Sequence, residues 1–242
     1  MPALSLKRVP TGIQGLDALM EGGFVCRSNV LLRGSTGTGK TLLSLQYLYA
    51  GAARYNEPGI FLSFSESQEA LYTHGDLMGW DFRKLEEENR FTFIRYSPHE
   101  VESIIHEGGG TIRDTIEEIG ARRLVIDSLT AYTLLFENPY KADESILNLF
   151  DILRKWGCTS LLTSEAPATP EEGSFERLGF LTDSILNLYY LRQKDRRCRA
   201  LEIIKMRDTG HSDRIHGFTI GKGGRIEVTE RCAAFRYTSP QK

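Results

Sequence analysis

Residues 28–48 read Ser28-Asn-Val-Leu-Leu-Arg33, then Gly34-Ser-Thr-Gly-Thr-Gly-Lys-Thr41, then Leu42-Leu-Ser-Leu-Gln-Tyr-Leu48. The first segment is an apolar run typical of a strand, and the third has apolar residues at helical spacing. The middle segment matches the phosphate-binding pattern G-x-x-x-x-G-K-[ST] in the strand, loop and helix setting that this pattern requires. The stretch therefore predicts an α/β fold that binds a nucleoside triphosphate.

Each residue type in this loop has a physical role in holding phosphates. Glycines let successive N–H groups point at a phosphate, and the following helix adds the positive end of its dipole. We expect Lys40 to reach the β- and γ-phosphates and the Thr41 hydroxyl to bind a Mg²⁺ ion. A Gly-rich turn with a chance Lys-Thr pair is the alternative, which the flanking segments oppose. The predicted nucleotide contacts of the loop are Gly34, Ser35, Thr36, Gly37, Thr38, Gly39, Lys40, Thr41 and Leu42.

The composition describes an ordinary globular protein. A chain of 242 residues can bury one full core, and we predict one domain over 1–242, with a core at about 11–191 and a C-terminal extension at about 184–237. The net charge of -2 provides no basic field for nucleic acid or acidic membranes. No apolar stretch approaches membrane-spanning length, which favours a soluble, cytoplasmic protein. The cysteines lack a C-x-x-C pair and are expected to be reduced thiols without zinc; they are Cys26, Cys158, Cys198 and Cys232.

Strand-like runs alternate with helical patterns, which predicts a mainly parallel sheet flanked by helices on both faces. The expected strands are 29–33, 59–64, 90–96, 123–127 and 159–164. Four helices are expected. The first follows the phosphate loop and the second begins near Ser67; the third spans 110–119, and the fourth spans 144–156 and is ended by Gly157. From Ser184 the pattern changes to a C-terminal antiparallel extension. Its expected strands are 185–191, 200–207, 216–220 and 225–228.

Two acids are expected to complete the site. Asp127 ends an apolar strand, where a carboxylate beside the phosphate loop can hold Mg²⁺ directly or through water. Its alternative role is a cap on the next segment. Glu66 follows the strand 59–64, where a carboxylate can orient and partly deprotonate a water in line with the γ-phosphate. Its alternative is a place in the first turn of the next helix, with Ser65 or Ser67 as the cap.

With these residues in hand, the sequence resembles the KaiC family, a branch of the RecA-like ATPases, over nearly its whole length. The motifs that carry the resemblance are the phosphate loop and the segments 11–17, 22–24, 64–67, 79–82, 126–131, 163–165, 182–183 and 205–211. The resemblance implies a RecA-like P-loop NTPase with ATP and Mg²⁺ as cofactors. It also implies a homo-oligomer in the form of a hexameric ring and a regulatory protein partner.

The segment Lys205-Met-Arg-Asp-Thr-Gly-His211 is similar to the family pattern K-[ML]-R-G-[ST]-x-H. In KaiC-like hexamers this segment reaches from one subunit into the ATP site of the next. The resemblance therefore implies that Lys205 and Arg207 approach the neighbour's γ-phosphate, where a cation stabilises developing charge. The alternative is a solvated edge strand with alternating charge. The other nucleotide contacts that the resemblance implies are Met206, Thr209 and His211.

Two positions and one short stretch depart from the family pattern. Ser65 stands where KaiC domains usually carry the first of two adjacent acids, so only Glu66 remains and slow turnover is expected. Asp208 replaces the usual glycine, adding a side chain and a negative charge beside the expected γ-phosphate contact. Clock members carry a Ser-Thr phosphorylation pair before their Ile-Thr-Asp, whereas 179–183 here reads Gly-Phe-Leu-Thr-Asp. Autokinase activity of the clock type is therefore not supported.

Three functions remain open at this stage: a Mg-dependent ATPase ring that controls a partner protein, a single-stranded DNA-binding ATPase like the RecA and RadA paralogues, and an ATP-gated scaffold with little turnover. The stretches 131–143 and 166–178, expected to face a ring channel, carry aromatics but lean acidic, which disfavours nucleic acid. The basic run Arg192–Arg199 can form a nucleic-acid patch. The family's similar arginines favour instead a pairing with acids across the subunit interface. Ser65 and Asp208 support the scaffold.

Overall fold

The computed structural model describes residues 6–97, 100, 110–134, 136, 138–166, 178–193 and 195–229. In chain order the elements are β1 (Arg8–Val9), η1 (Asp17–Leu19), β2 (Phe24–Val25), β3 (Asn29–Gly34), α1 (Lys40–Arg54), β4 (Gly59–Ser63), α2 (Gln68–Leu77), α3 (Phe82–Glu87), β5 (Phe91–Arg95), α5 (Gly110–Ile119), β6 (Arg123–Asp127), α6 (Leu129–Thr133), α7 (Pro139–Trp156), β7 (Thr159–Ser164), α8 (Leu178–Leu181), β8 (Ser184–Gln193), β9 (Arg196–Met206), β10 (Ile215–Ile220), η3 (Lys222–Gly224) and β11 (Ile226–Thr229).

One large mixed sheet organises these elements, with the strand order β11-β10-β9-β8-β3-β7-β6-β4-β5. Strands β3, β7, β6, β4 and β5 run parallel to one another, and β8 joins them in parallel beside β3. Strands β9, β10 and β11 continue the sheet in antiparallel fashion. The predicted α/β fold, with a mainly parallel sheet and a C-terminal antiparallel extension, is confirmed. Residues 230–237 of the expected extension lie outside the described part of the chain.

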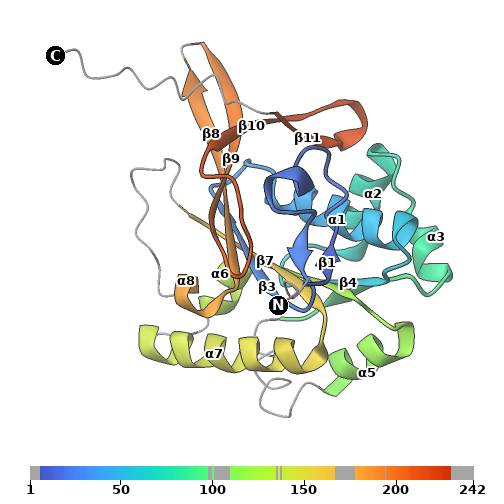
Figure 1. Ribbon diagram of the computed structural model, residues 1–242. Helices are drawn as coiled ribbons and strands as arrows, with labels where there is room; N and C mark the ends of the chain where they lie inside the picture. Colours follow the sequence, from blue (N-terminus) through green and yellow to red (C-terminus); the bar gives the residue numbers. More distant parts are fainter. Residues whose placement is uncertain are drawn as a thin grey trace, which may run out of the picture.

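Alternation along the buried strands divides the core into two layers. In β3, Val30 and Leu32 join the cluster that contains Leu43 of α1, whereas Leu31 joins the cluster that contains Phe150 of α7. Successive side chains of a strand point to opposite faces, so a continuously apolar strand must be covered on both sides. Figure 1 shows α5 and α7 along one face, with α1, α2 and α3 on the other.

Helix α7 illustrates how the local sequence sets an element. Its buried residues Ile146, Leu149, Phe150 and Leu153 recur at helical spacing and face the sheet. Gly157 ends the helix with a φ of 72°, as predicted. The helix starts earlier than predicted because Asn138 caps it through a hydrogen bond from Tyr140 N–H.

Several short elements differ from the sequence expectation. The stretch 131–143, expected to be a channel loop, holds the end of α6 and the first turn of α7. Ser128 caps α6 by accepting a hydrogen bond from Ala131 N–H. A helix as short as α6 carries too few apolar residues to show a helical period in the sequence. Helix α3 was not predicted for the same reason. Of the second expected channel stretch, residues 167–177 lie outside the described residues.

The described cysteines form no disulfide bonds with one another. They are Cys26, Cys158 and Cys198; Cys232 lies outside the described residues. Every helix within the described ranges is too short or too polar to cross a bilayer.

Candidate nucleotide site

The phosphate loop leaves the carboxyl end of β3 and leads into α1. Beside it lies a cavity of about 680 Å³, which is also lined by Glu66, Asp127 and Glu165. These acids follow or end three different strands, β4, β6 and β7, so the parallel topology brings them to one edge of the sheet. Open α/β sheets bind ligands at this carboxyl edge.

The backbone of the loop depends on its glycines. Gly37 and Gly39 have φ values of 80° and 105°, which side-chain-bearing residues rarely adopt. A Cβ on Gly34 would lie 2.7 Å from both Leu188 O and Thr38 Oγ1, so no side chain fits there. The loop is thus shaped to present backbone N–H groups at the start of α1, as a phosphate cradle requires.

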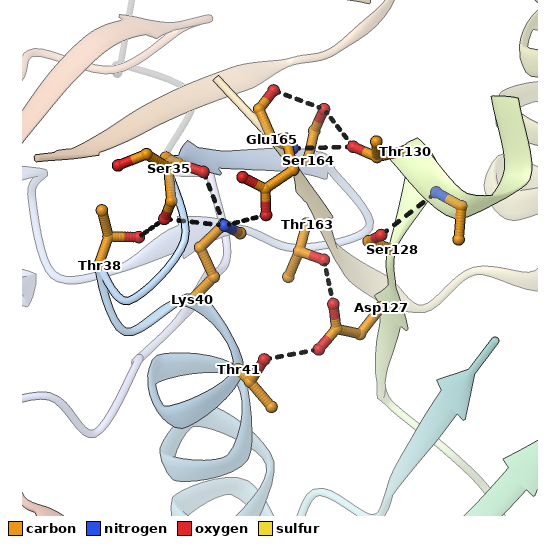
Figure 2. A network of polar contacts seen from close by, with 12 residues as sticks. Ser35, Thr38, Lys40, Thr41, Asp127, Ser128, Thr130, Thr163, Ser164 and Glu165 are labelled. Atoms are coloured by element: carbon orange, nitrogen blue, oxygen red, sulfur yellow. Dashed lines mark hydrogen bonds and ion pairs between the residues drawn. The ribbon is translucent and has the colours of Figure 1, made fainter. Parts of the chain in front are cut away.

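Lys40 is nearly buried and fully engaged. Its Nζ donates hydrogen bonds to Gly34 O at 2.6 Å and to Ser35 O at 3.2 Å. It also forms an ion pair with Glu165 Oε1 at 2.8 Å (Figure 2). The side chain is 9% exposed. Its ammonium therefore lies within the loop, where the phosphates of a nucleotide would meet it.

Asp127 joins two hydroxyl groups from neighbouring elements. Thr41 donates from Oγ1 to Asp127 Oδ2 at 2.8 Å, and Thr163 donates from Oγ1 to Asp127 Oδ1 at 2.6 Å (Figure 2). A carboxylate and hydroxyl oxygens suit Mg²⁺, which binds proteins through one or two carboxylates and takes its remaining ligands from water and phosphates. The donor set formed by Thr41 and Asp127 fits that ion.

Glu66 lies across the cavity with a raised proton affinity. Burial raises the pKa of its carboxyl group above the usual range, the Asp127 charge adds to the rise, and His74 opposes it. His74 Nδ1 lies 3.3 Å from Glu66 Oε1. The helical cap is Ser67, which accepts from Ala70 N–H, and α2 starts only at Gln68. The carboxylate of Glu66 is therefore outside the helix and faces the cavity, whose lining includes it.

The segment Lys205–His211 lies at the edge of the sheet where the parallel strands start, opposite the carboxyl edge that carries the chain's own phosphate loop. Arg207 N–H donates to Asp183 O, beyond the start of β8, while Gly34 pairs with Leu188 of β8. Five residues of strand correspond to about 16 Å. Arg207 and the phosphate loop of one chain are thus well separated.

The cations of this segment are bound to the end of α8. Lys205 Nζ donates to Gly179 O at 2.8 Å and to Thr182 O at 2.7 Å. Arg207 donates to Phe180 O at 3.0 Å. Burial lowers the pKa of Lys205, and the neighbouring Arg207 lowers it further.

The remaining residues of the segment have separate surroundings. Met206 is buried in the hydrophobic core, and Thr209 accepts a hydrogen bond from Arg8 at 2.6 Å. His211 Nδ1 lies 3.0 Å from Ser212 O. Asp208 has a φ of 54°, so it adopts the left-handed conformation available to the family's usual glycine.

Comparison with known proteins identifies the family of this chain. The family model described as "ATPase: KaiC" matches residues 9–233. The chain belongs to the KaiC ATPase family. The resemblance inferred from the sequence motifs is thereby confirmed.

Two relatives and one solved structure show how far the KaiC similarity extends. The circadian clock oscillator protein KaiC of Prochlorococcus marinus strain MED4 is 31% identical over 99% of this chain, which covers 50% of that protein. The chain thus spans about half the length of the clock relatives. The UPF0273 protein MJ1359 of Methanocaldococcus jannaschii is 32% identical, with 96% of this chain and 100% of that protein covered. The KaiC-like protein PH0186 of Pyrococcus horikoshii has 35% identity and a TM-score of 0.81, covering 93% and 99% of the two chains.

The structure adds residues to the KaiC-type site that sequence reasoning left without a role. In the sequence Thr163 and Glu165 stand out only as part of a motif; in the structure Thr163 lies near the end of β7, the strand beside β3, and Glu165 follows that strand. Met78 also lines the cavity. Arg199, from the basic run expected at a subunit interface, donates to Gly37 O at 3.1 Å and stacks over Tyr190. One arginine of that run therefore contacts the chain's own phosphate loop.

Proposed function

We propose that this KaiC-family protein is a Mg-dependent ATPase that works in the cytoplasm as a ring oligomer, with each active site shared between two subunits. The observation that carries the proposal is the division of functional residues between the two edges of one sheet. Lys40 and Asp127 line a cavity at the carboxyl edge. Arg207 lies at the opposite edge, where its N–H donates to Asp183 O just before the first residue of β8.

The carboxyl edge supplies the binding half of the proposed reaction. Lys40 binds the β- and γ-phosphates, and the loop N–H groups surround them. Thr41 and Asp127 hold Mg²⁺, which when bound neutralises charge on the phosphate oxygens. The Glu66 carboxylate accepts a proton from the attacking water and keeps that water in line with the γ-phosphate. Its raised pKa suits a general base that works near neutral pH.

The other edge supplies the second half from a neighbouring subunit. Lys205 and Arg207 stabilise the charge that develops on the γ-phosphoryl oxygens, which is the role of cations delivered in trans. About 16 Å of strand separates Arg207 from its own loop, so a head-to-tail arrangement of subunits is needed to bring the halves together. A closed head-to-tail arrangement is a ring, and the family resemblance supports a hexamer. Nucleotide-dependent assembly of this kind suits a regulator of a partner protein.

Subunit mixing tests the shared site directly. Lys40→Ala removes the binding half, and Arg207→Ala removes the trans half, so each variant alone should lose at least about 100-fold in ATP hydrolysis. In a 1:1 mixture, about a quarter of the interfaces combine an intact loop with an intact Arg207. We expect the mixture to recover activity in about that proportion. Arg214→Ala, at an exposed arginine of the next loop, is the matched control with wild-type activity.

Particle mass and nucleic acid separate the other functions. The proposal expects ring-sized particles with ATP and no large stimulation by single-stranded DNA. Two inactive variants that stay inactive when mixed, or monomers under every condition, would contradict the shared site. A wild type that assembles but turns over no faster than Glu66→Gln would establish the scaffold that Ser65 and Asp208 favour.

A further inference from the structure

Glu165 forms an ion pair with Lys40 of the phosphate loop. Its Oε1 lies 2.8 Å from Lys40 Nζ, and the other two partners of that nitrogen are backbone carbonyls. Among the described residues, Glu165 is thus the one carboxylate that neutralises the ammonium. A phosphate that binds Lys40 has to take the place of this carboxylate.

We propose that Glu165 competes with nucleotide phosphates for Lys40 and thereby speeds the release of product ADP. This inference rests on the proposed function, because it concerns the same site. Glu165 contacts neither the phosphates nor the attacking water. It acts through Lys40 and is a positioning residue.

Burial of Lys40 is the physical reason for the competition. The side chain is 9% exposed, and a nearly buried ammonium needs a counter-charge because water cannot solvate it fully. When ADP starts to leave, the phosphates that neutralise Lys40 withdraw. A carboxylate already within reach takes over the ammonium, so the unpaired charge never forms and the barrier to departure falls.

The surroundings of Glu165 allow its carboxylate to move while its backbone stays in place. Glu165 N–H donates to Thr130 Oγ1 at 2.8 Å, which ties this position to α6. The side chain is 48% exposed, so the carboxylate can rotate into water when phosphate binds. A fixed backbone with a half-exposed acid at its end is suited to repeated exchange.

Glu165→Gln is the variant that tests the competition, because it keeps the shape and removes the charge. With a fluorescent ADP analogue and Mg²⁺, we expect its dissociation rate and its dissociation constant to fall about three- to tenfold, as suits a half-exposed ion pair. Pyrophosphate should gain affinity in the same proportion, and adenosine should not, because adenosine has no group for Lys40. Glu165→Ala is a second variant with the same expectation. Glu118→Gln, at an exposed acid on α5, is the matched control and should leave all constants unchanged.

The outcomes distinguish a failure of this inference from a failure of the proposed function. Equal ADP release from wild type and both Glu165 variants overturns the inference, and so does an equal gain for adenosine, which would show a general change of the cavity. A wild type that binds no ADP contradicts the proposed function itself. A wild type that binds ADP, with Glu165 variants that hold it longer, supports both.

Discussion

The Thr41 hydroxyl donates a hydrogen bond to Asp127 Oδ2 across 2.8 Å, joining the first turn of α1 to the end of β6. The two residues lie 86 positions apart in the chain. Their oxygens are the protein's contribution to the proposed Mg²⁺ site, and Thr163 holds the other carboxylate oxygen in place.

Asp127→Asn should weaken the response to Mg²⁺. The amide keeps the hydrogen bond from Thr41 but loses the charge that a divalent cation requires. We expect the Mg²⁺ concentration for half-maximal ATP hydrolysis to rise at least about tenfold, a loss of the size caused by removing support at a metal site. Titration of activity with Mg²⁺ measures it, with the exposed Asp151→Asn on α7 as the control. An unchanged midpoint would remove Asp127 from the site.

Glu66→Gln should abolish most hydrolysis while ATP binding remains. Loss of a general base costs about 10² to 10⁴ in rate. Because burial raises the pKa of Glu66, the loss of activity on acidification should begin at a higher pH than it would with a glutamate of ordinary pKa. His74 lowers this pKa, so His74→Ala should move the acid limb of the pH profile to higher pH. A limb that stays in place would show that Glu66 does not control it.

Gly34→Ala should destabilise the protein and the loop together. The added Cβ would meet Leu188 O and Thr38 Oγ1 at 2.7 Å, and backbone on the β8 side cannot give way cheaply. We expect a loss of about 1–3 kcal/mol in the free energy of unfolding, the usual cost of overpacking. Urea unfolding measures it. Gly221→Ala is the matched control, because its Cβ would meet nothing closer than 3.7 Å.

Arg123 provides a test of the buried scaffold away from the site. Its side chain is fully buried, pairs with Glu57 at 2.6 Å and donates to Tyr47 O and Pro10 O. Arg123→Ala leaves the partner charge and both carbonyls without their donor, and should cost about 3–5 kcal/mol in the free energy of unfolding. Arg122→Ala, at the exposed neighbouring arginine, should change it by less than about 0.5 kcal/mol. Similar urea midpoints for the two variants would contradict the assigned burial.

The two arginines show why some of the fold could not be predicted. In the sequence they form an Arg-Arg pair at the start of a strand, and nothing local shows which of the two is buried. In the structure Arg123 pairs with Glu57, 66 positions away, and its guanidinium group lies over the aromatic ring of Tyr47. By contrast, the core strands and helix α5 were predicted almost to the residue, because their apolar periods are local.

The candidate site divides in the same way. By itself, the sequence determined the phosphate loop from Gly34 to Thr41, because its glycines, its lysine and the helix start act within a few residues of one another. Only the tertiary structure decided that Glu165 neutralises Lys40, 125 positions away, and that Arg207 lies at the opposite edge of the sheet. Those relationships depend on the order β8-β3-β7-β6, which long-range strand pairing sets and sequence spacing does not encode.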